Sequence, residues 1–115
     1  MELPIQITFH GMGPSDAIEA RIRQRAQELR QFYDRIVGCR VVVESGPHHH
    51  RKGGIHYLRI HLTVPGGEIV VNRDPSEHHA HEDVYVAIRD AFDAARRQLE
   101  DHVRRMRGDT KMHER

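Results

Sequence analysis

The stretch from Glu82 to Arg107 has the longest regular hydrophobic pattern in the sequence. No Pro or Gly interrupts it before Gly108. A helix of about 26 residues, rising ~1.5 Å per residue, would be roughly 39 Å long and would need a broad apolar surface beneath it. Its apolar side chains recur at steps of three and four residues and would form one stripe: Val84, Ile88, Ala91, Phe92, Ala95, Leu99, Val103 and Met106.

The same periodicity predicts an earlier helix that begins after Ser15 or Gly13 and ends near Asp34. Glu19 and Arg23 stand four residues apart on its polar side, a spacing that favours an ion pair. Its apolar face would hold Ile18, Ile22, Ala26, Leu29 and Phe32 or Tyr33.

Four other stretches alternate apolar and polar residues, which is typical of strands with one buried face. They are residues 4–9, 37–44, 57–64 and 68–73. The turn sequence Pro65-Gly66-Gly67 separates the last two and predicts a hairpin. The third strand would bury Leu58, Ile60, Leu62 and Val64 and expose Tyr57, Arg59, His61 and Thr63.

The predicted element order is therefore β-α-β-β-β-α, which belongs to the α+β class. Two helices with one apolar face each would cover one face of a four-stranded sheet and leave the other face in water. A length of 115 residues suits one domain with one core. We expect this domain to span residues 1–107, with residues 108–115 as a flexible tail.

The composition points to a cytoplasmic protein without a membrane partner. No apolar run approaches the ~20 residues of a membrane span, and the N-terminus lacks the pattern of a secretion signal. The single cysteine, Cys39, lies in a valine-rich strand, where we expect a buried and unreactive thiol.

The formal net charge of +1 argues neither for nor against a nucleic-acid partner. Positive charge is concentrated between Ser45 and Gly67, where no acidic residue occurs. In the long helix, acidic residues gather near the start, and the end carries Arg104, Arg105 and Arg107. The helix dipole favours that gradient without any ligand, by ~0.3–1 kcal/mol per charge, so the gradient alone does not indicate RNA binding.

Three stretches carry a family resemblance: LRQFYDRIVGCRVVVE (Leu29 to Glu44), GGEIVVNRD (Gly66 to Asp74) and EDVYVAIRDAFDAARRQL (Glu82 to Leu99). Together with the element order, they resemble the ribosome hibernation-promoting factor and ribosome-associated translation inhibitor family, also described as sigma-54 modulation or S30EA-like proteins, in its short form. The resemblance covers nearly the whole chain.

The resemblance implies a fold similar to double-stranded-RNA-binding domains and a specific function. The protein would bind the small ribosomal subunit at ribosomal RNA in the channel for messenger and transfer RNA. It would thereby inhibit translation and promote ribosome hibernation under stress. We expect a monomer that needs no cofactor and has no small-molecule substrate.

The implied RNA contacts are basic residues at positions that match the family pattern. They are Arg25, Arg35, Arg97, Arg105 and Arg107, with Arg104 one place from such a position. The charge of the histidine-rich loop adds Arg51 and Lys52 as candidates.

A metal-binding module is an alternative hypothesis, because imidazole nitrogens and carboxylates bind zinc or nickel. Adjacent histidines on one loop rarely converge on an ion, and the sequence has neither a Cys pair nor a His-Glu-x-x-His helix. We therefore expect no metal, and the weak candidate ligands are His48, His49, His50, His78, His79 and His81.

A protein-interaction or regulatory module of the same fold, with weak RNA affinity, is the other alternative. The equal numbers of acidic and basic residues in the long helix favour it. Catalysis is not expected, because no serine has the sequence context of a nucleophile and Cys39 lies within a strand.

Overall fold

The computed structural model describes residues 3–46, 55–72 and 83–113, and its elements confirm the predicted α+β class and β-α-β-β-β-α order. The elements are β1 (Ile5–His10), α1 (Asp16–Phe32), β2 (Gly38–Gly46), β3 (Ile55–Val64), β4 (Gly67–Asn72) and α2 (Val84–His113).

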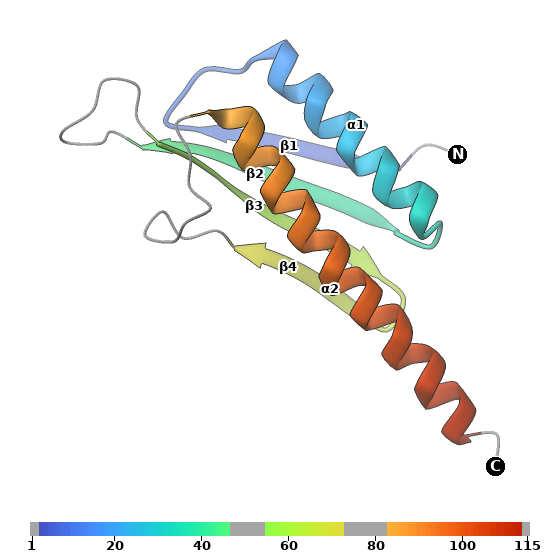
Figure 1. Ribbon diagram of the computed structural model, residues 1–115. Helices are drawn as coiled ribbons and strands as arrows, with labels where there is room; N and C mark the ends of the chain where they lie inside the picture. The colour runs from blue at the N-terminus through green and yellow to red at the C-terminus, as the bar shows by residue number, and fades with distance from the viewer. Residues whose placement is uncertain (1–2, 47–54, 73–82, 114–115) are drawn as a thin grey trace.

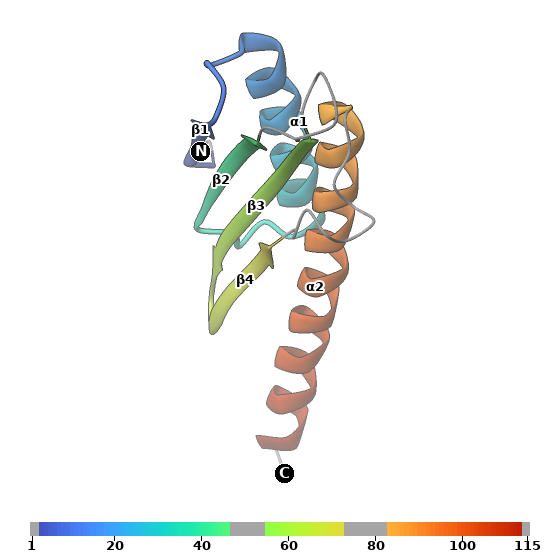
Figure 2. The ribbon, with the colours of Figure 1, turned by 90° about the vertical axis from the view of Figure 1, so that its left-hand side faces the viewer.

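The four strands form one mixed sheet in the order β1-β2-β3-β4. β1 is parallel to β2, and the other neighbouring pairs are antiparallel. A parallel pair needs a crossover connection, which α1 supplies. Both helices lie on the same face of the sheet (Figures 1 and 2), as the two apolar helix faces predicted.

The core lies between this sheet face and the two helices. On β3, the inward-facing Leu58, Ile60 and Leu62 have no exposed surface, and on α2 the same is true of Ile88 and Leu99. Burial of each such side chain contributes about 1.5–3 kcal/mol. From α1 and β2 the core receives Ile18, Ile22, Ala26, Leu29, Cys39, Val41 and Val43.

Local sequence chemistry accounts for the start and end of α1. The backbone N–H of Ile18 donates to the Ser15 hydroxyl oxygen at 3.3 Å, which satisfies one of the free donors at the helix start. The helix ends at Phe32, two residues before the predicted end, because Tyr33 takes an extended backbone conformation. The predicted ion pair between Glu19 and Arg23 is present at 3.9 Å.

The helix α2 is longer than predicted and buries a wider face. It continues six residues past the predicted end at Arg107, through Gly108 to His113. A single glycine inside a helix costs only about 1 kcal/mol, so Gly108 does not end it. Ala87, Ala94 and His102 are also buried, which the predicted stripe did not include.

The start of the second strand was predicted wrongly. Val37 lies before β2 and its side chain is 59% exposed, while the preceding Ile36 is buried in the core. The backbone N–H of Val37 donates to the Thr63 carbonyl oxygen at 2.8 Å. This bond ties the incoming chain to β3, and Ile36 takes the core position that the alternation had given to Val37.

The turn between β3 and β4 is held against α2 by a contact that we call the hairpin clamp, formed by Pro65, Gly66, His102 and Met106. His102 is buried, and its Nε2 lies 3.0 Å from the Pro65 carbonyl oxygen. Gly66 has a φ of 84°, a conformation that L side chains rarely adopt. A Cβ at Gly66 would also lie 2.9 Å from the terminal methyl of Met106, a flexible side chain that can move aside, so the positive φ is the stronger reason for glycine there.

The thiol of Cys39 is buried, as predicted. Burial raises its pKa to about 12, so the nucleophilic thiolate is scarce at neutral pH. Among the described residues, no helix is both long enough and apolar enough to cross a membrane.

Because Leu99 is completely buried between α2 and the sheet, Leu99→Ala should reduce the free energy of unfolding by about 2–5 kcal/mol. Gln98→Ala, at the exposed neighbouring position, is the matched control and should change it by no more than about 0.5 kcal/mol. Urea denaturation followed by circular dichroism measures both. Equal stability of the two variants would contradict this account of the core.

Candidate nucleic-acid interface

Six of the predicted RNA-contacting residues lie within the described part of the chain, at two places in the fold. Arg97, Arg104, Arg105 and Arg107 are on α2, Arg25 is on α1, and Arg35 follows α1. The other two candidates, Arg51 and Lys52, fall outside the described residues, so their positions stay predictions.

The candidate arginines of α2 lie on several sides of its C-terminal half. Arg97 and Arg104 stand seven residues apart, almost two full turns, and therefore share the outward-facing side of the helix. Arg105 and Arg107 are exposed as well. The last turns of α2 project beyond the sheet (Figure 1), so this end of the helix is accessible from several sides.

Acidic neighbours engage some of these arginines. Arg104 lies 3.1 Å from Asp101, and Arg25 lies 3.3 Å from Glu28. Both pairs are partly or largely exposed, so each contributes little stability. Within residues 3–46, 55–72 and 83–113, no acidic partner is found for Arg35, Arg97, Arg105 or Arg107, whose charges are therefore available to an anionic ligand.

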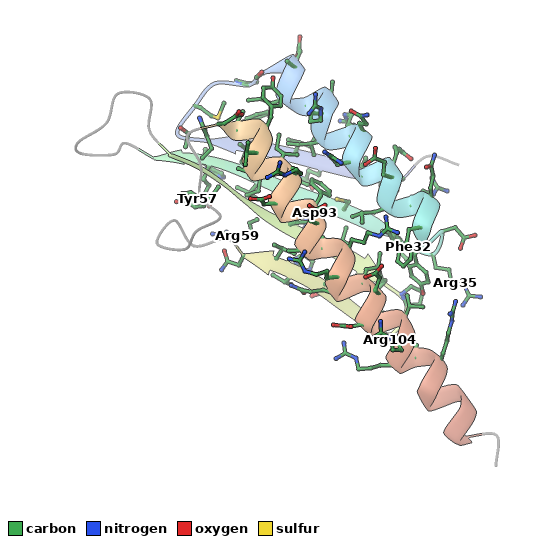
Figure 3. All side chains as sticks on the ribbon, viewed as in Figure 1. Phe32, Arg35, Tyr57, Arg59, Asp93 and Arg104 are labelled. Carbon is green, nitrogen blue, oxygen red and sulfur yellow. The ribbon has the colours of Figure 1, made fainter. Side chains whose placement is uncertain are left out.

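A groove of about 330 Å³ lies where the end of α1 meets α2, and we call it the helix-end groove. Its lining residues are Phe32, Tyr33, Glu100, Val103, Arg104 and Arg107. Figure 3 shows Phe32 and Arg35 at this end of α1, with Arg104 on the neighbouring part of α2. Two helices thus bring aromatic and basic side chains together.

The hydrophobic pattern placed Phe32 or Tyr33 on the core face of the first helix, and Tyr33 does pack against the core. The pattern did not indicate that the other aromatic residue, Phe32, would line a groove. Phe32 is instead 38% exposed, and the guanidinium carbon of Arg96 lies 4.6 Å from its ring centroid. The useful signal was the pair of adjacent aromatic residues, since two neighbouring positions on a helix cannot both face the core squarely.

A second groove, of about 410 Å³, lies between α2 and the edge strand β4. Arg97 and Gln98 line it from the helix, and Asn72 lines it from the strand. Arg97 therefore faces a different groove from Arg104 and Arg107, although all three belong to one helix.

In the described part of the chain, the uncovered face of the sheet carries both paired and unpaired positive charge. Arg59 on β3 bonds to Glu44 at 3.2 Å and to Asn72 at 3.4 Å. The Tyr57 hydroxyl donates to Glu44 at 3.2 Å, so one carboxylate holds two side chains. His61 Nε2 lies 2.9 Å from Glu68, although not in hydrogen-bonding geometry. This face is polar, as predicted, and the exposed Arg40 of β2 has no ion pair among the described residues.

The predicted metal-ligand candidates His48, His49, His50, His78, His79 and His81 lie outside the described residues. In the part of the chain that the structure describes, no group of three or more His, Cys, Asp or Glu side chains could hold a metal ion. The metal-binding hypothesis therefore stays a prediction about the two histidine-rich segments.

Comparisons with known proteins agree on one family and one fold. The sequence pattern of the family described as Sigma 54 modulation protein / S30EA ribosomal protein matches residues 5–107. No curated protein sequence matches the chain.

Two similar solved structures are a ribosomal subunit interface protein from Coxiella burnetii and the N-terminal domain of Protein Y from Thermus thermophilus. The first has a TM-score of 0.69 and 15% identity, and the match covers 87% of this chain and 97% of that chain. The second has a TM-score of 0.68 and 21% identity, with 89% and 99% covered. At these identities the structures show a common fold, whereas the family assignment rests on the sequence pattern over residues 5–107. The chain belongs to the Sigma 54 modulation protein / S30EA ribosomal protein family.

Proposed function

We propose that this chain binds the small ribosomal subunit at its ribosomal RNA, in the channel for messenger and transfer RNA. Binding there would inhibit translation and promote ribosome hibernation under stress. The observation that carries the proposal is the family match over residues 5–107, since the family description names a ribosomal protein. The Coxiella burnetii relative in fold is itself described as a ribosomal subunit interface protein.

The arrangement of arginines supports an RNA partner. Arg105 and Arg107 project from the end of a rigid helix, and Arg35 lies at the adjacent end of α1. A guanidinium group can donate two parallel hydrogen bonds to one phosphate. Because these three arginines have no acidic partner among the described residues, a phosphate would not have to displace one.

A protein-interaction module with weak RNA affinity is the second candidate function. Among the described residues, five arginines of the two helices are paired with acidic residues of the same helix: Arg23 with Glu19, Arg25 with Glu28, Arg89 with Asp90, Arg96 with Glu100, and Arg104 with Asp101. These pairs lower the positive potential that steers a protein toward RNA. The measurements below separate the two candidates.

If about five phosphates are neutralised on binding, log affinity should fall against log salt concentration with a slope of roughly −3.5 to −4.5. Cosedimentation with purified small subunits over a series of salt concentrations measures this slope. Affinity that does not change with salt would favour the protein-interaction module.

The double variant Arg105→Glu/Arg107→Glu should weaken cosedimentation by about tenfold or more, because hydrogen bonds to charged groups contribute about 1.5–3 kcal/mol each. It should also relieve the inhibition of reporter synthesis in a cell-free translation reaction. The matched control is Arg23→Glu/Arg89→Glu, which makes the same change in net charge away from the end of α2. Equal behaviour of the two double variants would contradict a role for the C-terminal arginines.

Asp101→Asn should strengthen RNA binding by about two- to fivefold, because it frees Arg104 from an exposed ion pair of the strength usual for such pairs. The variant gains function, so misfolding cannot imitate the result. Asp93→Asn, at an exposed position two turns earlier on α2 (Figure 3), is the control for net charge. Identical affinities of the two variants would show that the pair with Asp101 does not restrain Arg104.

A further inference from the structure

The end of α1 turns two consecutive aromatic side chains toward the helix-end groove. Phe32 is the last helical residue, and Tyr33 has φ −141° and ψ 105°, an extended conformation. The backbone N–H of Tyr33 donates to the Leu29 carbonyl oxygen at 2.9 Å, which fixes the point where the conformation changes. Tyr33 packs partly against the core, whereas Phe32 is 38% exposed. The groove therefore has an aromatic lining, and the backbone conformation at the end of α1 sets the direction of the two rings.

The exposed ring of Phe32 already has a stacking partner before any ligand binds. The guanidinium carbon of Arg96 lies 4.6 Å from the ring centroid, and Arg96 is also within 3.5 Å of Glu100. Stacking of this kind is favourable by about 0.5–1 kcal/mol at exposed sites. Since Arg96 occupies one face of the ring, a ligand would meet the opposite face or the edge.

The charges around the aromatic residues suit an anion. Arg104 and Arg107 line the groove from α2, and Arg35 follows Tyr33 by two residues. The acidic lining residue, Glu100, already pairs with Arg96. Arg104 is paired with Asp101, whereas Arg107 and Arg35 have no acidic partner among the described residues. An aromatic surface thus lies beside positive charge that Glu100 does not cancel.

We propose that the helix-end groove binds one unpaired nucleotide of a single-stranded RNA segment, an inference that rests on the proposed RNA-binding function. The base would stack against Tyr33 and Phe32, and the phosphates beside it would contact Arg104, Arg107 and Arg35. A volume of about 330 Å³ lies within the range of small-ligand pockets.

A double helix would leave this groove unused. In a duplex the faces of the bases are stacked on one another, so a protein meets only phosphates, sugars and base edges, and the aromatic rings find no base face to stack on. Unpaired bases stack readily on aromatic side chains and arginine planes, which is how proteins commonly recognise single-stranded loops. The groove therefore extends the proposed phosphate contacts to a preference for single-stranded RNA.

The test compares a fluorescein-labelled single-stranded RNA of about nine nucleotides, within the usual site size for one small domain, with the same RNA annealed to its complement. Fluorescence anisotropy at low salt should show tighter binding of the single strand. Tyr33→Leu and Phe32→Leu should each weaken single-strand binding by about 5- to 150-fold and leave duplex binding nearly unchanged. Tyr33→Phe keeps the ring and should bind like the original chain.

Circular dichroism melting checks that the variants fold. Phe32→Leu alters an exposed ring, so it carries the test if Tyr33→Leu, which touches the core, does not fold. Photocrosslinking of a 4-thiouridine RNA to the unaltered chain gives a readout without mutation. Crosslinks should map to residues 32–33 and 103–107.

Three results would overturn the proposal. The first is equal affinity for the single strand and the duplex, and the second is unchanged single-strand binding by both leucine variants. The third is loss of ribosome cosedimentation by Tyr33→Leu while its binding to RNA is unchanged, which would mark the groove as a protein contact. If the original chain still cosediments with ribosomes in these cases, only the groove assignment fails. Absence of both cosedimentation and RNA binding would overturn the proposed function as well.

Discussion

The packing of α2 over the inner face of β3 is the interaction on which the rest of the structure depends. β3 is an inner strand of the sheet, and its side chains Leu58, Ile60 and Leu62 have no contact with water. Only one face of the sheet is covered, so these side chains would be exposed without α2 (Figure 2). The same packing turns the opposite side of α2 outward and so fixes the direction of Arg97 and Arg104.

Neighbouring charges, rather than the number of arginines, distinguish the surfaces of this domain. On the open sheet face, Glu44 balances Arg59 and also binds Tyr57. Along the helices, acidic residues three or four positions away occupy several arginines, whereas Arg35 and Arg107 have no such partner among the described residues. Arg35 and Arg107 therefore place positive charge at one end of the molecule, beside the aromatic residues that close α1.

The sequence patterns were sufficient for the element order because helices and strands differ clearly in hydrophobic period. They could not show that Val37 is exposed. The Val37 backbone bonds to β3, and Ile36, not Val37, is buried in the core. Likewise, sequence alone predicts that a polar residue such as His102 is exposed. Its partner, the Pro65 carbonyl oxygen, is 37 positions away in the sequence and is found only in the folded chain. The groove was beyond prediction for the same reason, because Phe32 and Arg96 meet only in the folded chain. The arginines implied by family resemblance are exposed except for the half-buried Arg25, but sequence alone did not reveal which of them are paired.

The hairpin clamp divides α2 into two parts with different mechanical roles. Up to Met106 the helix contacts the sheet or its β3–β4 turn, and from there to His113 it extends a further ~10 Å without the sheet beneath it (Figure 1). The β3–β4 turn is thus the last part of the sheet that holds α2 in position. Exposed residues beyond Met106, such as Arg107, make no contact with the core, so their substitution should have little effect on it. Substitutions in the hairpin clamp would instead change the direction in which the end of α2 leaves the sheet. They would therefore move Arg107, which lies beyond the clamp, relative to the rest of the domain.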